Sequence, residues 1–136
     1  PVTTSDCSTF TFENGSAADA SSGVYLEFTL HFMAEKDMIV HLNSADSSAD
    51  SADGTRISSG NASLPESMRI AFTADGQTWI YDQGTADTSY ELCSLKAYTD
   101  KPVLIHIWME GTDPACTDDL KAADYAIRMR FTGESK

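Results

Sequence analysis

The chain of 136 residues has few basic residues, few cysteines and no long apolar run. Nine Lys and Arg against twenty-one Asp and Glu give a net charge of -12, which repels phosphate backbones and anionic lipid headgroups. No apolar stretch approaches the roughly 20 residues that a membrane-spanning helix requires. We therefore expect one soluble domain over residues 1–136, with no nucleic-acid partner and no membrane insertion.

An initiator methionine and a signal peptide are also missing. The first ten residues, PVTTSDCSTF, contain neither the basic region nor the apolar core of a signal peptide. We expect either that a leader has been removed or that the chain was trimmed.

Cysteine is scarce: Cys7, Cys93 and Cys116 are the only three. Three cysteines permit one disulfide with one thiol left over, and their spacing does not resemble a CxxC metal site. Cys93 falls on the core-facing side of a predicted strand and is interpreted as a buried thiol. Cys7 and Cys116 lie in or beside loops, so Cys7–Cys116 is the preferred disulfide and Cys93–Cys116 the alternative.

Familiar catalytic motifs are absent from the sequence. There is no GxSxG elbow, no Gly-rich phosphate loop, no HExxH and no Cys/His nucleophile pattern. His31, His41 and His106 are the only histidines, and a zinc site would need them to converge from distant strands. Three unrelated strand histidines are the preferred interpretation.

The chain is rich in apolar residues that alternate with polar ones, the pattern of a strand with one buried face. Residues 24–33 show it most clearly, with Leu26, Phe28 and Leu30 on the predicted core face and Tyr25, Glu27, Thr29 and His31 on the wet face. Strands are predicted at 8–13, 24–33, 37–42, 68–73, 78–81, 90–98, 103–110 and 125–131. This order without intervening helices predicts an all-β fold, an antiparallel two-sheet, jelly-roll-like β-sandwich of about eight strands.

Turn residues suggest how these strands connect. The strands at 24–33 and 37–42 are predicted to form a hairpin, as are 68–73 and 78–81 through Ala74-Asp75-Gly76. The strands at 90–98 and 103–110 are predicted to pair in the register that sets Cys93, Leu95 and Ala97 beside Ile107, Ile105 and Val103. The alternative register would place Lys96 in the core. Residues 43–66 are predicted as a long Ser/Asp-rich loop, and 118–123 as a helical turn.

The last predicted strand, at 125–131, also alternates. It is expected to expose Arg128 and Arg130 and to bury Tyr125, Ile127, Met129 and Phe131.

Acidic loops are candidates for calcium, which prefers several carboxylate oxygens in one turn. Asp46, Asp50 and Asp53 fall four and three apart, unlike the alternate acids of an EF-hand, so a solvated loop is preferred there. A second, more compact cluster consists of Glu110, Asp113, Asp118 and Asp119. Calcium at this second cluster is the weaker alternative to a solvated loop.

Glu110 and Asp113 also raise the question of a glycosidase, which needs two carboxyl groups at a set separation across a cleft. Sequence alone does not place the two groups. Any pair among twenty-one acidic residues would be equally eligible.

The stretch 102–133 organises the rest of the chain. One face of its first strand, with Val103, Ile105 and Ile107, is assigned to the core, but the opposite face is too apolar for plain solvent and consists of Leu104, His106, Trp108 and Glu110. We predict that this second face is covered by the acidic loop with Cys116 or by a strand donated by another subunit. Four residues are predicted to bind a ligand or mediate assembly: Trp79, His106, Trp108 and Glu110.

Several segments resemble a known group of proteins. YLEFTLHF, DMIVHLNSADS, SMRIAFT, WIYD and VLIHIWMEGTDPACTDDL resemble secreted proteins of Gram-positive, clostridial-type bacteria, whose signature is Ile-Trp-(hydrophobic)-Glu-Gly-(Thr/Trp)-Asp followed by Cys. Residues 107–113 and Cys116 match this signature. That group is similar in outline to the TasA and camelysin family, exported through SipW-type signal peptides. The resemblance covers most of 25–133, but the Asn-x-Phe-x-x-Gly pattern usual near the start is not evident here.

The resemblance implies a jelly-roll-like β-sandwich, secreted or attached at the cell surface, that assembles into matrix fibres by strand exchange. We therefore expect a non-enzymatic protein with a structural, biofilm-matrix or adhesion role, whose partners are copies of itself or other matrix proteins. A binding module for carbohydrate or another small ligand is the alternative. A hydrolase or metalloprotease is a distant third. No cofactor is expected, with calcium as the alternative.

Overall fold

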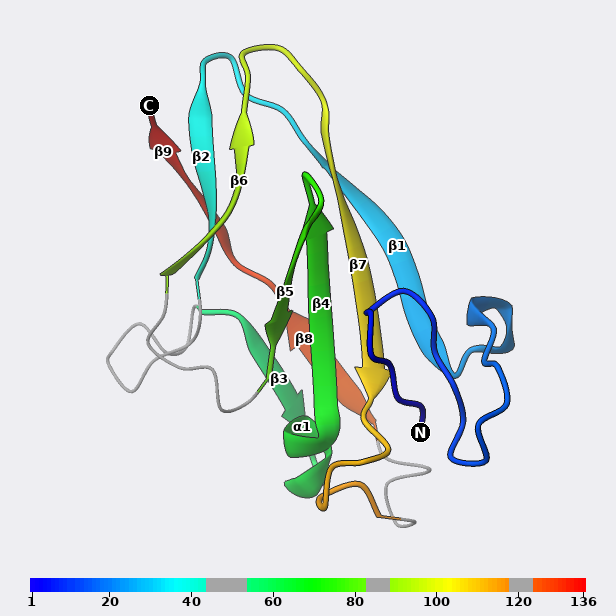
Figure 1. Cartoon of the computed structure of the whole chain (residues 1–136). Coiled ribbons are helices and arrows are strands. Elements are labelled where there is room, and N and C mark those ends of the chain that lie inside the picture. Colours follow the sequence, from blue (N-terminus) through cyan, green and yellow to red (C-terminus); the bar gives the residue numbers. More distant parts are fainter. Residues whose placement is uncertain (44–53, 83–88, 118–123) are drawn as a thin grey trace.

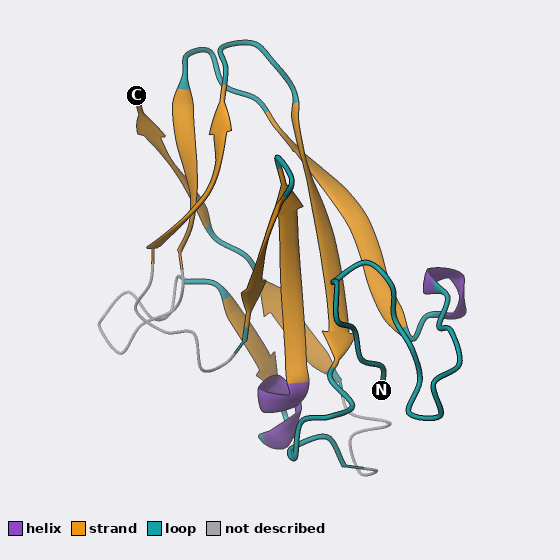
Figure 2. Cartoon of the chain, in the orientation of Figure 1, coloured by secondary structure: helices purple, strands orange, loops and turns teal. Residues whose placement is uncertain are grey.

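The computed structural model describes residues 1–43, 54–82, 89–117 and 124–136 (Figure 1). Within these ranges two short helices accompany nine strands, against about eight predicted (Figure 2). The helices are η1 (Ala20–Ser22) and α1 (Ser63–Ser67). The strands are β1 (Tyr25–Phe32), β2 (Met38–Asn43), β3 (Arg56–Ser59), β4 (Met68–Ala74), β5 (Gln77–Tyr81), β6 (Ser89–Leu95), β7 (Lys101–Met109), β8 (Tyr125–Arg128) and β9 (Phe131–Ser135).

The strands form two packed antiparallel layers, which confirms the predicted all-β, sandwich-like fold. The first layer has the order β1-β7-β4-β5. The second layer consists of a three-stranded sheet with the order β6-β2-β9 and a separate two-stranded sheet, β3-β8. Asn43 links the two parts of the second layer, because its N–H donates to the Arg130 carbonyl at 3.0 Å while its own carbonyl accepts from Thr55 N–H at 2.8 Å.

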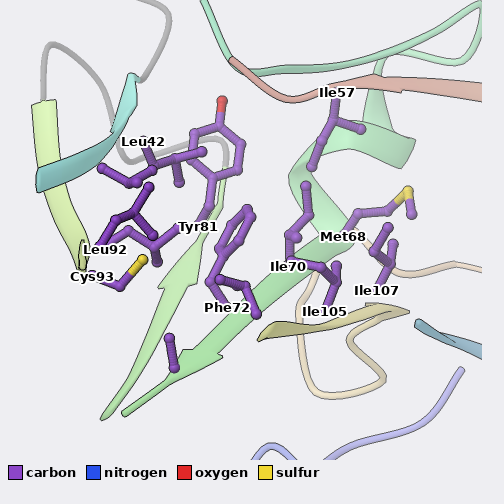
Figure 3. Packing of buried hydrophobic residues seen from close by; sticks show 14 of the residues in the cluster. Leu42, Ile57, Met68, Ile70, Phe72, Tyr81, Leu92, Cys93, Ile105 and Ile107 are labelled. Atoms are coloured by element: carbon purple, nitrogen blue, oxygen red, sulfur yellow. The ribbon is translucent and has the colours of Figure 1, made fainter. Parts of the chain in front are cut away.

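The main core lies between the layers (Figure 3). The first layer contributes side chains such as Ile70, Phe72 and Ile105, all fully buried, and the second contributes Leu42 and Leu92. Burying a side chain of this size stabilises the fold by about 1.5–3 kcal/mol. These alternating apolar residues therefore account for much of the stability of the sandwich.

The predicted hairpin between β4 and β5 is confirmed. Ala74 pairs with Gln77, and the turn residues Asp75 and Gly76 have φ of 53° and 74°. A two-residue hairpin turn with both central residues at positive φ matches the twist of the flanking strands, and Asp-Gly is favoured there because Gly adopts such angles without strain.

The predicted hairpin between β1 and β2 is wrong. β1 pairs with β7, whereas β2 pairs with β6 and β9, so residues 33–37 cross from one layer to the other. Alternation shows which face of a strand is buried, and it carries no information on which strand lies alongside.

The predicted register between residues 90–98 and 103–110 is also wrong. β6 pairs with β2, with Cys93 opposite Val40 and Leu95 opposite Met38. Cys93 and Leu95 still share a core with Ile105, but they reach it from the opposite layer. The burial of these residues was predicted correctly, and the neighbours were not.

The loop predicted at 43–66 contains regular structure. β3 lies within it and α1 begins within it, and these elements bury Ile57 and Leu64 at 1% and 0% exposure. Ser and Asp dominate the composition of this stretch, which obscured the two short elements. Residues 44–53, including Asp46, Asp50 and Asp53, lie outside the described residues, as does the helical turn predicted at 118–123.

The strand predicted at 125–131 is divided into β8 and β9, which pair with β3 and β2 in turn. Tyr125 was predicted to be buried and is 44% exposed, because it lies at the outer end of the short β3-β8 pair opposite Ser59. Ile127 is half-buried against the main core, as are Met129 and Phe131.

Candidate functional site

The candidate site lies on the outer face of the first layer, where residues 1–12 cross the lower part of β7 (Figure 1). We call residues 1–12 the cover segment. Its local shape comes from Asp6, whose carboxylate accepts hydrogen bonds from the backbone N–H groups of Thr9 at 2.7 Å and Ser8 at 2.9 Å. These bonds hold the pKa of Asp6 well below its ordinary value. The resulting tight turn leaves Cys7 at a φ of 59° and buries its side chain.

Two backbone hydrogen bonds attach the start of the cover segment to the end of β7. Val2 N–H donates to the Met109 carbonyl at 3.1 Å, and Gly111 N–H donates to the Val2 carbonyl at 2.9 Å. A Cβ at Gly111 would lie 3.5 Å from the Pro1 side chain, an ordinary van der Waals contact, so Pro1 and Gly111 lie side by side. The cover segment is thus anchored at the Glu110-Gly111 part of the sequence signature.

An aromatic cluster holds the other end of the cover segment. The Phe10 ring stacks on Tyr25 with centroids 4.1 Å apart and meets the edge of Trp108 at 5.1 Å. Phe10 is 1% exposed and Trp108 3%. This second cluster is separate from the main core, because β7 and β4 lie between them.

The structure corrects two expectations about this face. Within this chain, the apolar second face of β7 is covered by the cover segment, which was neither of the two covers expected. The strand predicted at 8–13 does not form, and only single-residue bridges join Thr3 to Thr11 and Thr11 to Ala17. Turn-forming hydrogen bonds to Asp6 compete with an extended ladder here.

Glu110 is the buried carboxylate of this site. Its Oε1 accepts the Trp108 indole N–H at 2.9 Å, and its Oε2 accepts both the Thr112 N–H at 3.0 Å and the Thr112 hydroxyl at 2.8 Å. Burial raises the pKa of Glu110, but hydrogen bonds from Trp108, Thr112 and the Thr3 side chain outweigh it, so the pKa is lowered overall. The carboxylate therefore joins β7, the following turn and the cover segment.

Asp113 is engaged in the same turn. It accepts from Arg69 Nη2 at 2.5 Å and from Ala115 N–H at 2.8 Å, and the Arg69 hydrogen bond lowers the pKa of Asp113. Arg69 also donates to the carbonyl of Glu66 at 2.9 Å. The turn after β7 is thereby tied to the end of α1.

These contacts bear on the predicted calcium site. Glu110 and Asp113 both accept from protein donors, whereas Asp118 and Asp119 lie outside the described residues. In the ranges that the structure describes, no group of three or more His, Cys, Asp or Glu side chains is placed to hold a metal ion. Calcium at this loop stays a prediction.

The four predicted ligand or assembly residues do not form one site. Trp108, His106 and Glu110 lie together on β7, but Trp79 on β5 faces the main core and stacks on Tyr90 with ring centroids 4.0 Å apart. Trp79 keeps part of its surface in solvent, whereas Trp108 is buried. Of the two tryptophans, only Trp79 offers a surface to a sugar ring.

The three histidines lie on separate strands, each beside one carboxylate. His106 is 1% exposed, and its Nε2 lies 2.7 Å from a Glu27 carboxylate oxygen, while its buried Nδ1 has no hydrogen-bond partner among the described residues. The other two pairs are exposed to different degrees: His31 with Asp100 and His41 with Glu134, each at 3.0 Å.

All three cysteines lie within the described residues, and none is in a disulfide bond. Burial raises the pKa of the Cys7 and Cys93 thiols, which makes them poor nucleophiles in the folded chain. The Cys7–Cys116 disulfide stays a prediction for thiol counting to decide. Cys116 lines a cavity of about 630 Å³ between the cover segment and the turn after β7.

Sequence reasoning missed the main contributors to this site. Val2 and Phe10 were not assigned to any core, and Tyr25 was placed on the wet face of β1, yet all three are buried here. At that end of β1 it is Leu26, predicted to be buried, that is 43% exposed. The sequence did contain one indication. Tyr25 is a large aromatic residue on the otherwise polar face of its strand, and the outer face of β7 was too apolar to be left in solvent.

Fold and site together define an all-β, two-layered antiparallel protein whose outer sheet face is closed by its own first residues. No family model, no curated protein and no solved structure matches the chain. Among the described residues, no helix is both long and apolar enough to cross a membrane.

Proposed function

We propose that this protein is a secreted or cell-surface, non-enzymatic β-sandwich that assembles with copies of itself into a structural matrix. Assembly occurs by exchange of the cover segment: residues 1–12 of one copy occupy the outer face of β7 in the next. Other matrix or surface proteins that offer a similar segment are further partners.

The observation that supports exchange is how the cover segment is held. It buries Val2 and Phe10 against the sheet, yet no continuous strand ladder attaches it. Among the described residues, its backbone hydrogen bonds to β7 and the turn after it are those of Val2 with Met109 and Gly111. Such a segment opens at lower free energy than a strand inside a sheet. Its release exposes Trp108 and Tyr25, so an equivalent segment from another copy restores the same burial.

A disulfide that locks the cover segment tests this proposal. A Cβ at Gly111 would lie 3.5 Å from Pro1 Cβ, within the roughly 3.5–4.5 Å of natural disulfides. The double variant Pro1→Cys/Gly111→Cys, oxidised before assembly, is expected to form no filaments under warming or acidification, and reductant should restore filament assembly. Size-exclusion chromatography and electron microscopy measure the outcome.

The order of oxidation supplies the control. If the double variant is first assembled and then oxidised, the new disulfide should link neighbouring copies and give a ladder of covalent oligomers. Gly111→Cys alone should give neither effect. A wild-type chain that forms no filaments under all these conditions, or an oxidised double variant that forms filaments normally, would sink the proposal.

Carbohydrate binding is the second candidate, favoured by the Trp79–Tyr90 pair. Its rings are nearly parallel, at 14°, and both side chains are half-buried. Exposed aromatic surface at such a pair can stack on a sugar ring. A glycan array should then respond to the wild-type chain and not to Trp79→Ala, and a silent array counts against this function.

A further inference from the structure

β1 is the outer strand of the first layer and has a regular free edge. Its eight residues pair with β7 without a register shift, from Tyr25 opposite Trp108 to Phe32 opposite Lys101. No backbone hydrogen bond joins β1 to any described residue outside β7. The strand at the opposite edge of the first layer is β5, which is shorter, with five residues.

β1 lacks most of the features that prevent the addition of another strand, and Glu27 is its one acidic or basic residue apart from His31. Natural edge strands are commonly protected by Lys, Pro or a bulge, or by being short. β1, with sequence YLEFTLHF, has no Lys, no Pro and no bulge. It also leaves apolar surface open on its core-facing side, because Leu26 is 43% exposed and Phe28, Leu30 and Phe32 are only half-buried.

The sequence of β1 is complementary to itself. If two copies pair antiparallel with Thr29 opposite Thr29, then Phe28 lies opposite Leu30 and Leu26 opposite Phe32 on one face. On the other face Glu27 lies opposite His31. Shifting the pairing by two residues in either direction keeps the faces matched but sets Glu27 opposite Thr29 or Met33, so this register alone pairs the acid with the histidine.

The side chains in this register are accessible. Glu27 and His31 are 44% and 61% exposed, although each already contacts one residue of its own chain, His106 and Asp100 respectively. Thr29 is exposed on the same face. A chain with a net charge of -12 repels its own copies in general, so an interface needs local complementarity of this kind.

We infer that β1 pairs with β1 of a second copy about a two-fold axis through Thr29, joining two four-stranded layers into one continuous eight-stranded sheet. This pairing uses a different surface from exchange of the cover segment and does not depend on it. The two contacts together would link copies in two directions.

Cysteine cross-linking tests the predicted register. Two copies of Thr29→Cys should place their thiols opposite each other, since directly opposed Cβ atoms lie roughly 4.5–5.5 Å apart. Mild oxidation is therefore expected to give a covalent dimer. Thr78→Cys is the matched control, because Thr78 is exposed in the same cross-strand row, through Leu104 and Thr73, but lies on β5. Equal cross-linking of the two variants, or none for Thr29→Cys, overturns the inference.

A charge reversal tests the same contact without cysteine. His31→Glu sets two carboxylates opposite each other twice in the dimer, so the dimer seen by sedimentation should be lost, while Thr78→Glu adds the same charge to the same face and should leave it intact. A melting curve confirms that both variants fold. The oxidised Pro1→Cys/Gly111→Cys chain should still dimerise through β1, which separates failure of this inference from failure of cover-segment exchange.

Discussion

The two faces of β7 are buried in different ways. Its inner face, with Val103, Ile105 and Ile107, packs against a second layer whose strands are joined by hydrogen-bonded ladders. Its outer face, with His106 and Trp108, is covered by a segment held by isolated bridges and one aromatic cluster. Burial is nearly complete on both faces, so the degree of burial does not reveal how permanent a contact is.

Opening the inner face requires separation of the two layers and therefore global unfolding. Opening the outer face requires only loss of the cover segment, while the four-stranded sheet remains paired. Local openings of this kind span free energies from near zero up to the global value. The comparison predicts different responses to equivalent changes on the two faces.

The largest effect is expected inside the sandwich. Ile105→Ala removes a fully buried side chain between two layers that cannot close around the gap, and should lower the free energy of unfolding by about 2–5 kcal/mol. Urea denaturation measures it. Phe28→Ala, at a half-buried position on the edge strand, should cost less. A negligible change for Ile105→Ala would contradict the assignment of this face to the main core.

The matching change on the outer face is Phe10→Ala. A fully packed Phe costs about 3–5 kcal/mol when truncated, but here the loss cannot exceed the free energy that docks the cover segment, so a smaller value is expected. Tryptophan emission should shift to the red before global unfolding, because Trp108 becomes wet. If emission and circular dichroism change together, and the free energy of unfolding falls by the full amount for a packed Phe, the cover segment is part of the cooperative core.

Glu110→Gln should lower the free energy of unfolding by a smaller amount, about 1–3 kcal/mol, because an amide N–H then faces the Thr112 donor. The pKa of Glu110 is lowered in the folded chain. The ionised carboxylate therefore stabilises the fold fully above the ordinary pKa of 4.5, and this stabilisation is lost as pH falls through the pKa of the folded state. The stability gap between wild type and variant should therefore narrow in acid. A gap that is constant with pH would count against this role.

Thiol labelling compares the two regions without changing stability. Cys7 lies within the cover segment with its side chain buried and Cys93 lies between the layers, and burial raises the pKa of both thiols. Cys7 should react with a thiol reagent at a rate set by local opening, and Cys93 only on global unfolding. Equal protection would remove the distinction between the faces, and a single reactive thiol in denaturant without reductant would establish a disulfide.

Much of the fold could be predicted from local pattern. The alternation in β1, β4 and β7 gave their positions within one or two residues, and Asp75-Gly76 gave the β4-β5 turn. The partners of β2 and β6 could not be predicted, because several antiparallel arrangements bury the same faces. Of the candidate site, the apolar outer face of β7 was evident, but its cover lies about a hundred residues away in the sequence, and no local pattern links Phe10 to Trp108.

The sequence by itself determined where most strands run, which side of each is apolar, and that the face carrying His106 and Trp108 needs a cover. These properties follow from the two-residue period of a strand, which every local segment carries. Only the tertiary structure decided that β1 and β2 belong to different layers and that residues 1–12 close the outer face. Such choices depend on packing between segments distant in the chain, where many pairings satisfy the same pattern and only their combined burial selects one.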